Sequence, residues 1–171
     1  MKNFFLILFC LIIQSTSAQP PDVPNIDSLK TEEEFAYYEN KLLLCIEWLR
    51  MNPLTQDYEL RIRTGAFIRY WTSKTPTLTL KINHKISSPI LKEKDFPYTA
   101  DIYMAYYSGM LEYQLNNPDE TDPFIIQSKG VENVLQLYFY NKEILKKSEA
   151  IQEFLQLSES NELEEWIRRK I

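Results

Sequence analysis

Apolar residues return every three to four positions over most of the chain, which is the spacing of a helix with one buried face. The first such stretch begins at Thr31, which forms a capping box with Glu34, and it stops at Asn52-Pro53. Its expected buried stripe is Phe35, Tyr38, Leu42, Cys45, Ile46 and Leu49. This part of the sequence therefore predicts one long amphipathic helix.

A second helix is predicted after Thr55 or Asp57, either of which can cap it, and it ends near Ser73. Its expected buried stripe is Tyr58, Ile62, Ala66, Ile68 or Arg69, and Trp71. Residues 77–82 then alternate between apolar and polar side chains, which is typical of a strand. Because the sequence offers no second strand to pair with it, we expect a short extended connector here.

Further helices are predicted where a proline follows a capping or turn residue, because proline suits the first turn of a helix. The expected helices cover residues 88–93, residues 97–116 and a stretch from Pro123 capped by Asp122, and two shorter ones begin at Ser148 and Ser160. The stretch after Pro123 has its expected stripe at Ile126, Gly130, Val134, Leu137 and Tyr138 or Asn141.

The chain also matches itself at an offset of 65 positions. The matching pairs include Asn52-Pro53 with Asn117-Pro118, Asp57 with Asp122, and Gly65 with Gly130. Either the match is a chance agreement of few identities, or it marks two copies of a helix hairpin. We therefore expect an all-α domain of antiparallel helix hairpins, arranged like a helical repeat or as an irregular bundle.

The chain has only three glycines, and Gly65, Gly109 and Gly130 all lie within predicted helices. Glycine inside a helix costs about 1 kcal/mol relative to alanine, so each position needs a compensating reason. One reason is a close crossing of two helices, and the other is the floor of a ligand pocket.

The N-terminus has the three parts of a secretory signal peptide. Lys2 is followed by an apolar run from Phe4 to Ile13 and by small residues that end at Ala18. The run is too short to span a membrane, which takes roughly 20 residues. We expect residues 1–18 to be a signal peptide cleaved near Ala18, residues 19–27 to be a proline-rich lead-in, and residues 28–171 to form one domain. The protein would then be exported to the periplasm or the outside, without a stable membrane anchor.

The net charge argues against a nucleic-acid partner, and the cysteine content argues against an internal disulfide. The whole chain has a net charge of −5, and removing Lys2 with the signal peptide leaves 18 basic and 24 acidic side chains, or −6. An acidic chain has no general attraction to nucleic acid. Cys10 leaves with the signal peptide, so Cys45 has no cysteine partner in the mature chain and no internal disulfide is expected.

The sequence contains no recognisable catalytic or metal-binding motif. The single histidine, His84, lies in a polar connector, and its only thiol partner would be Cys45 on an apolar helix stripe. The carboxylates of residues 119–122 resemble a capping loop more than a calcium site, because their spacing is not that of an EF-hand. We therefore expect no catalytic residue, no metal, no cofactor and no enzymatic activity.

Tyrosines crowd the helix predicted over residues 97–116. Tyrosine suits interfaces because its ring is apolar and its hydroxyl stays in water. We take Tyr103, Tyr106 and Tyr107 as candidate partner-binding residues, with core packing as the alternative for the same side chains. The function this favours is an exported binding protein with an unknown protein partner. The alternatives are a hydrolase that uses Asp and Glu side chains and a carrier of an apolar ligand.

The chain combines a signal ending in Ser17-Ala18-Gln19 with the segments 45–49, Asn52-Pro53-Leu54, 66–71 and 73–77. This combination resembles a family of small exported helical proteins from Bacteroidota. It consists of core and loop residues, so it implies the fold and the export of the chain but no activity and no site residue.

Overall fold

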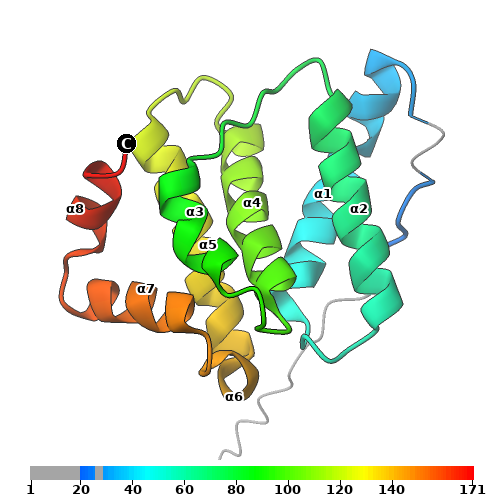
Figure 1. Ribbon diagram of the computed structural model, residues 1–171. Helices are drawn as coiled ribbons and strands as arrows, with labels where there is room; N and C mark the ends of the chain where they lie inside the picture. Colours follow the sequence, from blue (N-terminus) through cyan, green and yellow to red (C-terminus); the bar gives the residue numbers. More distant parts are fainter. Residues whose placement is uncertain (1–19, 26–28) are drawn as a thin grey trace, which may run out of the picture.

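The computed structural model describes residues 20–25 and 29–171, and over these residues the chain is all-α, as the sequence predicts (Figure 1). The helices are α1 (Glu32–Met51), α2 (Tyr58–Lys74), α3 (His84–Lys92), α4 (Thr99–Asn116), α5 (Pro123–Tyr140), α6 (Lys142–Leu145), α7 (Glu149–Glu159) and α8 (Leu163–Arg168). Residues 77–82 form an extended connector without strand pairing. The predicted signal peptide lies outside the described residues, as do residues 19, 26 and 27 of the predicted lead-in.

Side-chain caps explain most of the helix starts. Thr31 and Glu34 form the reciprocal capping box of α1, and Asp57 accepts a hydrogen bond from a backbone N–H of α2. Asp122 and Ser148 cap α5 and α7 in the same way. These side chains satisfy N–H groups that have no partner within the helix, which is why local sequence predicts these four starts correctly.

The start of α3 was predicted too late. The helix begins at His84, with Asn83 as its cap, and Pro89 lies inside it. Asn83 is held in place from outside the helix, because its backbone N–H donates to Gln127 of α5 and its side chain donates to the carbonyl of Lys170. The prediction failed because these contacts are tertiary. The four-residue helix α6 was not predicted either.

The hairpins α1–α2 and α4–α5 have matching ends at the offset of 65 positions. The ends of α1 and α4 lie 65 positions apart, and so do the starts of α2 and α5. The asparagine after each first helix caps it in the same way: Asn52 Nδ2 donates to the carbonyl of Trp48 at 3.0 Å, and Asn117 Nδ2 donates to that of Tyr113 at 2.9 Å. Both pairs of helices are antiparallel (Figure 1).

Helices α4 and α5 cross closely through glycine. A Cβ atom at Gly109 would lie 2.5 Å from the Lys129 carbonyl oxygen and from Asn133 Cβ, both on α5. A Cβ atom at Gly130 would lie 2.6–2.8 Å from the ring and the carbonyl oxygen of Tyr106 on α4. Close helix crossing, one of the two readings for these glycines, is therefore confirmed at Gly109 and Gly130.

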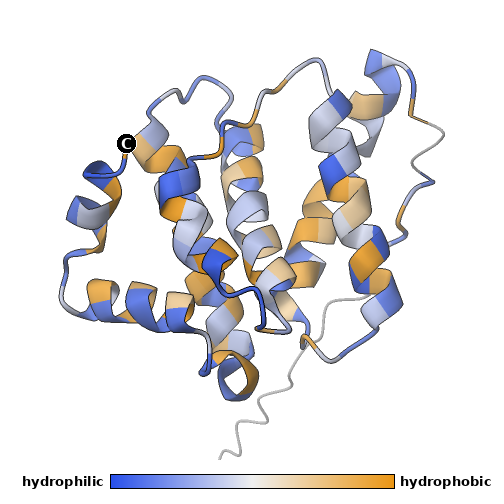
Figure 2. Ribbon diagram, in the orientation of Figure 1, coloured by the Kyte–Doolittle hydropathy of each residue, from blue (hydrophilic) through white to orange (hydrophobic). Residues whose placement is uncertain are grey.

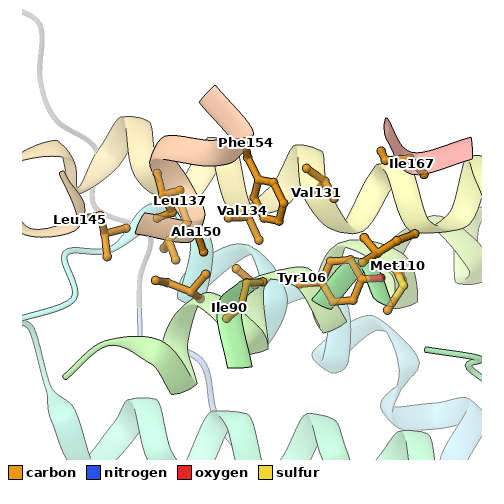
Figure 3. Close-up of a cluster of buried hydrophobic side chains, with 14 of the residues drawn as sticks. Ile90, Tyr106, Met110, Val131, Val134, Leu137, Leu145, Ala150, Phe154 and Ile167 are labelled. Carbon is orange, nitrogen blue, oxygen red and sulfur yellow. The ribbon is translucent and has the colours of Figure 1, made fainter. Parts of the chain in front are cut away.

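The buried side chains form two clusters rather than one continuous core. The larger cluster lies among α3 to α8, and Figure 3 shows part of it, with Tyr106, Met110 and Val134 close together. The smaller cluster joins α1 and α2 and includes Leu111 from α4. Figure 2 shows hydrophobic and hydrophilic positions interspersed along each helix, as helices with one buried face require. We refer to the boundary between the two clusters as the seam.

Polar contacts hold the two sides of the seam together. They are the ion pairs Arg50–Glu112 at 2.6 Å and Arg61–Asp101 at 3.1 Å, and hydrogen bonds from Arg50 to Asn133 and from the backbone N–H of Leu54 to Asn141. Both arginines are largely buried. The α1–α2 hairpin therefore docks on the rest of the molecule partly through charged groups, whereas α4 and α5 cross closely through glycine.

Candidate functional site

A pocket of about 350 Å³ lies at the seam between α2 and α4, with parts of α1 and α5 as its floor. In Figure 1 the two wall helices run side by side in the same direction. Two contacts fix their register: Arg61 pairs with Asp101, and a Cβ atom at Gly65 would lie 3.4 Å from Met104 Cε. A volume of this size falls in the range of small-molecule sites.

Small residues leave the space that forms the pocket. Gly65 and Ala66 on α2 face Ala100 and Ala105 on α4, and at Gly65 the flexible end of Met104 reaches across the gap between the helices. Gly65 is therefore not at a close crossing like the other two glycines. It lies in the pocket wall, which was the second reading for these positions.

The apolar lining corrects the predicted burial of α2. Tyr58 is 71 % exposed and Ile62 54 % exposed, and with Ala66 they form the outer part of the pocket lining rather than the core. The stripe that is in fact buried runs along Leu60, Thr64, Phe67, Ile68 and Trp71. Helix α2 has apolar residues on more than half of its circumference, and the sequence does not show which part faces α1.

Three arginines line the pocket, and only one of them has no ion-pair partner among the described residues. Arg61 donates to Asp101 and to the carbonyls of Leu49 and Asn52 at the end of α1. Arg50 is paired with Glu112. Arg69 is exposed and lines the pocket without an ion pair within residues 20–25 and 29–171. Its guanidinium is therefore open to an anion from outside the chain.

A second polar group in the pocket is also open. Ser108 on α4 is 2 % exposed and lines the pocket, and its Oγ has no hydrogen-bond partner among the described residues. Leaving a buried hydroxyl unpaired costs about 1–3 kcal/mol. By contrast, Asn133 in the same pocket is satisfied, because it donates to the Ala105 carbonyl and accepts from Arg50.

The three predicted partner-binding tyrosines do not share one environment. Tyr106 is fully buried in the larger cluster, where its hydroxyl donates to Gln127 of α5, so its assignment to a binding surface is corrected to core packing (Figure 3). Tyr103 and Tyr107 are half-buried. Burial raises the pKa of both hydroxyls, and the charge of Arg69 partly offsets that rise. Both tyrosines therefore lie close to the free cation of the pocket.

The other residues that the sequence singled out have structural roles or lie apart from the pocket. His84 is exposed at the start of α3, whereas Cys45 is buried in the smaller cluster, and no hydrogen bond joins them among the described residues. In the loop before α5, Asp122 caps the helix, and Glu120 accepts from the backbone N–H of Asp122. Cys10 lies outside the described part of the chain.

Cys45 is expected to be unreactive in the folded protein. Burial raises the pKa of its thiol from 9.0 to about 12, so the reactive thiolate is scarce at pH 8. In a Cys10→Ser chain, a disulfide reagent at pH 8 should label Cys45 only after urea unfolds the protein. Rapid labelling without urea would contradict the buried placement.

The same shift predicts a pH dependence of stability. Above pH 9 the unfolded thiol loses its proton while the folded thiol keeps it, so stability should fall as the pH rises from 9 toward 12. The expected loss from this group is about 1 kcal/mol between pH 9 and pH 10. Urea unfolding at both pH values measures it, and a Cys45→Ala chain, which lacks the titrating thiol, should lose that part of the dependence.

Comparison of the chain with protein-family models, with curated proteins and with solved structures finds no match. Within residues 20–25 and 29–171, no helix is both long and apolar enough to cross a membrane. The same residues contain no group of three or more histidine, cysteine or acidic side chains placed to hold a metal ion.

Proposed function

We propose that the protein is exported and acts as a non-catalytic binding protein that holds a ligand with an apolar body in the seam pocket. The observation that carries this proposal is a mostly apolar pocket that also contains two open polar groups: within residues 20–25 and 29–171, Arg69 has no ion pair and the Ser108 hydroxyl has no hydrogen-bond partner. Binding sites for small molecules are mostly apolar and contain a few polar groups that orient the ligand. The export rests on the signal-like residues 1–18.

The chemistry of the lining supports binding rather than catalysis. Asp101 is the one carboxylate among the residues lining the described pocket, and it is engaged by the buried Arg61. General acid–base catalysis needs a group that is free to exchange a proton with the substrate. The lining also contains no thiol and no imidazole, so the hydrolase alternative has no nucleophile or base here beyond a serine without a neighbouring base.

Blocking the pocket tests the proposal. The neutral fluorophore N-phenyl-1-naphthylamine should bind the unaltered protein at one site with a rise in fluorescence. Ala66→Trp adds an indole ring at an exposed position of the pocket wall, so it should weaken this binding by about tenfold or more. Unfolding temperatures measured in parallel should show that the variant is folded.

Arg63→Trp is the matched control, because Arg63 is exposed on the same helix but does not line the pocket. It should leave fluorophore binding unchanged. The proposal is wrong if the unaltered protein does not bind the fluorophore, or if Ala66→Trp and Arg63→Trp bind it equally well.

A protein partner at the same face is the second candidate function. It is favoured by Tyr58 and Ile62, which are exposed one turn apart on α2, since contiguous exposed apolar side chains mark interaction surfaces. The Ala66→Trp variant separates the two candidates. Its indole fills the pocket and should block a ligand there. At the rim, where a protein partner would bind, the indole only adds aromatic surface and should leave binding of the partner intact.

A further inference from the structure

The two ends of the seam pocket are lined by different kinds of side chain. The register between the wall helices α2 and α4 shows which side chains lie at each end. Arg61–Asp101 and Gly65–Met104 pair positions that ascend together along α2 and α4. One turn further along both helices, the same register places Arg69 opposite Ser108. The unpaired guanidinium and the unpaired buried hydroxyl therefore lie at the same end of the pocket, on opposite walls.

The other end of the pocket has no unpaired charge among the described residues. Tyr58 and Ile62 on α2 lie opposite Pro97 and Ala100 near the start of α4, and the charges of Arg61 and Asp101 beside them are paired with each other. Tyr58 and Arg69 are 11 residues apart along α2, and at 1.5 Å per residue this is a length of roughly 16 Å. The pocket is thus an elongated slot with a mostly apolar lining and unpaired hydrogen-bond donors at one end.

From this arrangement, and on the basis of the function proposed above, we infer that the ligand is an amphiphile with a single carboxylate on an unbranched apolar body. The carboxylate accepts hydrogen bonds from Arg69 and Ser108, and the apolar body lies along Ile62 toward Tyr58. Arginine presents paired donors that match the two oxygens of a carboxylate. The one acidic side chain in the lining, Asp101, is neutralised by Arg61 and lies two turns from Arg69, so it does not repel the head group.

Three other features agree with this orientation. Tyr103 and Tyr107 lie near Arg69, although neither tyrosine lines the pocket, so an anion at Arg69 would lie on the side of α4 that carries half-buried aromatic rings. Met104, at the centre of the slot, has a flexible and polarizable side chain that adapts to an apolar chain. The cations of Arg50 and Arg61 are already paired with carboxylates, so Arg69 is the lining cation that an added anion can neutralise.

The test compares head groups on one chain length, by displacement of N-phenyl-1-naphthylamine at pH 7.5. Decanoate should displace the fluorophore from the unaltered protein at a concentration about tenfold lower than decan-1-ol, which has the same chain without charge. Arg69→Gln should remove this preference. Arg63→Gln, a change of the same kind at an exposed arginine outside the lining, should keep it.

Ser108→Ala supplies a second readout that a purely structural serine would not give. It should weaken decanoate binding several-fold, yet raise the unfolding temperature of the ligand-free protein, because the buried hydroxyl has no partner there. Thr64→Val is the control. Thr64 Oγ1 is also buried without a partner among the described residues but does not line the pocket, so its removal should leave decanoate binding unchanged.

The outcomes separate this inference from the proposed function. Equal displacement by decanoate and decan-1-ol, or equal losses in the Arg69→Gln and Arg63→Gln chains, would overturn the carboxylate while the pocket remains a binding site. The pocket itself is not the site if neither compound displaces the fluorophore from the unaltered protein, or if both displace it from the Ala66→Trp chain as well as they do from the unaltered protein. In that case the proposed function and the inferred carboxylate are both wrong.

Discussion

Replacing Gly109 with alanine is expected to lower the free energy of unfolding by about 2 kcal/mol. The new methyl group would lie 2.5 Å from the Lys129 carbonyl oxygen and from Asn133 Cβ, so α4 and α5 would have to move apart along their closest crossing. Overpacking of this kind costs about 1–3 kcal/mol or more, and backbone atoms cannot swing aside as a side-chain tip can. The gain in helix propensity of about 1 kcal/mol offsets only part of the cost.

Gly65→Ala is the matched control for this prediction. Its methyl group would meet only the flexible end of Met104, at 3.4 Å, so the helix propensity gain should dominate. We expect Gly65 to tolerate alanine with unchanged or slightly higher stability, while Gly130→Ala, which meets Tyr106 at 2.6 Å, should behave like Gly109→Ala. Urea unfolding followed by tryptophan fluorescence measures all three chains, and equal stability of the Gly109 and Gly65 variants would contradict the close crossing.

Removing the carboxylate of Asp101 is expected to lower the free energy of unfolding by about 3 kcal/mol. Arg61 is 5 % exposed, and Asp101→Ala leaves its guanidinium buried without a counter-charge. Breaking a buried pair typically costs 3–5 kcal/mol, and we take the low end because Asp101 itself is 25 % exposed. The carbonyls of Leu49 and Asn52 remain as acceptors and limit the loss.

A double-mutant cycle distinguishes the charge from simple packing. Arg61→Met with Asp101→Ala should cost at least about 1 kcal/mol less than the sum of the two single changes, because the double variant leaves no unpaired charge in the seam. Glu143→Ala, which removes the exposed partner of Lys146, should cause no measurable change. Strict additivity of the Arg61 and Asp101 changes would show that the pair does not hold the seam.

Together the two predictions describe two interfaces between helices that differ in packing. At the α4–α5 interface the helices touch at two glycines, and Gly109 leaves no room for an added methyl group. The interface between α1–α2 and the rest of the molecule uses ion pairs across a gap lined by small residues, and the seam pocket lies in that gap.

Much of the local structure was predictable from the sequence, for reasons visible at single residues. Thr31, Asp57, Asp122 and Ser148 cap helices by bonds to backbone groups two or three positions ahead, and such bonds need no distant partner. Ile126, Gly130, Val134 and Leu137 of the predicted α5 stripe are buried. The polar Gln127 and Asn133 are buried on the same helix, because they form hydrogen bonds to other segments that the sequence does not show.

The candidate site was only partly predictable. Helix α2 has two apolar stripes, and Tyr58 and Ile62 belong to the one that remains exposed. The prediction assigned these two residues to the core, whereas they line the pocket. Tyr106 and Tyr107 are neighbours in the sequence, yet Tyr106 is buried against Gln127 and Tyr107 lies near Arg69. The crowding of tyrosines on one helix did not show which of their side chains are buried and which remain partly exposed.

The amino-acid sequence by itself determined the helices, most of their ends and the matching of the two hairpins, because spacing, capping and proline act within a few residues along the chain. The tertiary structure alone decided where the pocket lies, and which of the arginines and hydroxyls in its lining have no partner among the described residues. Those properties depend on the register between α2 and α4 and on how closely each hairpin can pack. Register and packing arise from contacts between residues some 40 positions apart, such as Arg61 with Asp101, and no local pattern specifies them.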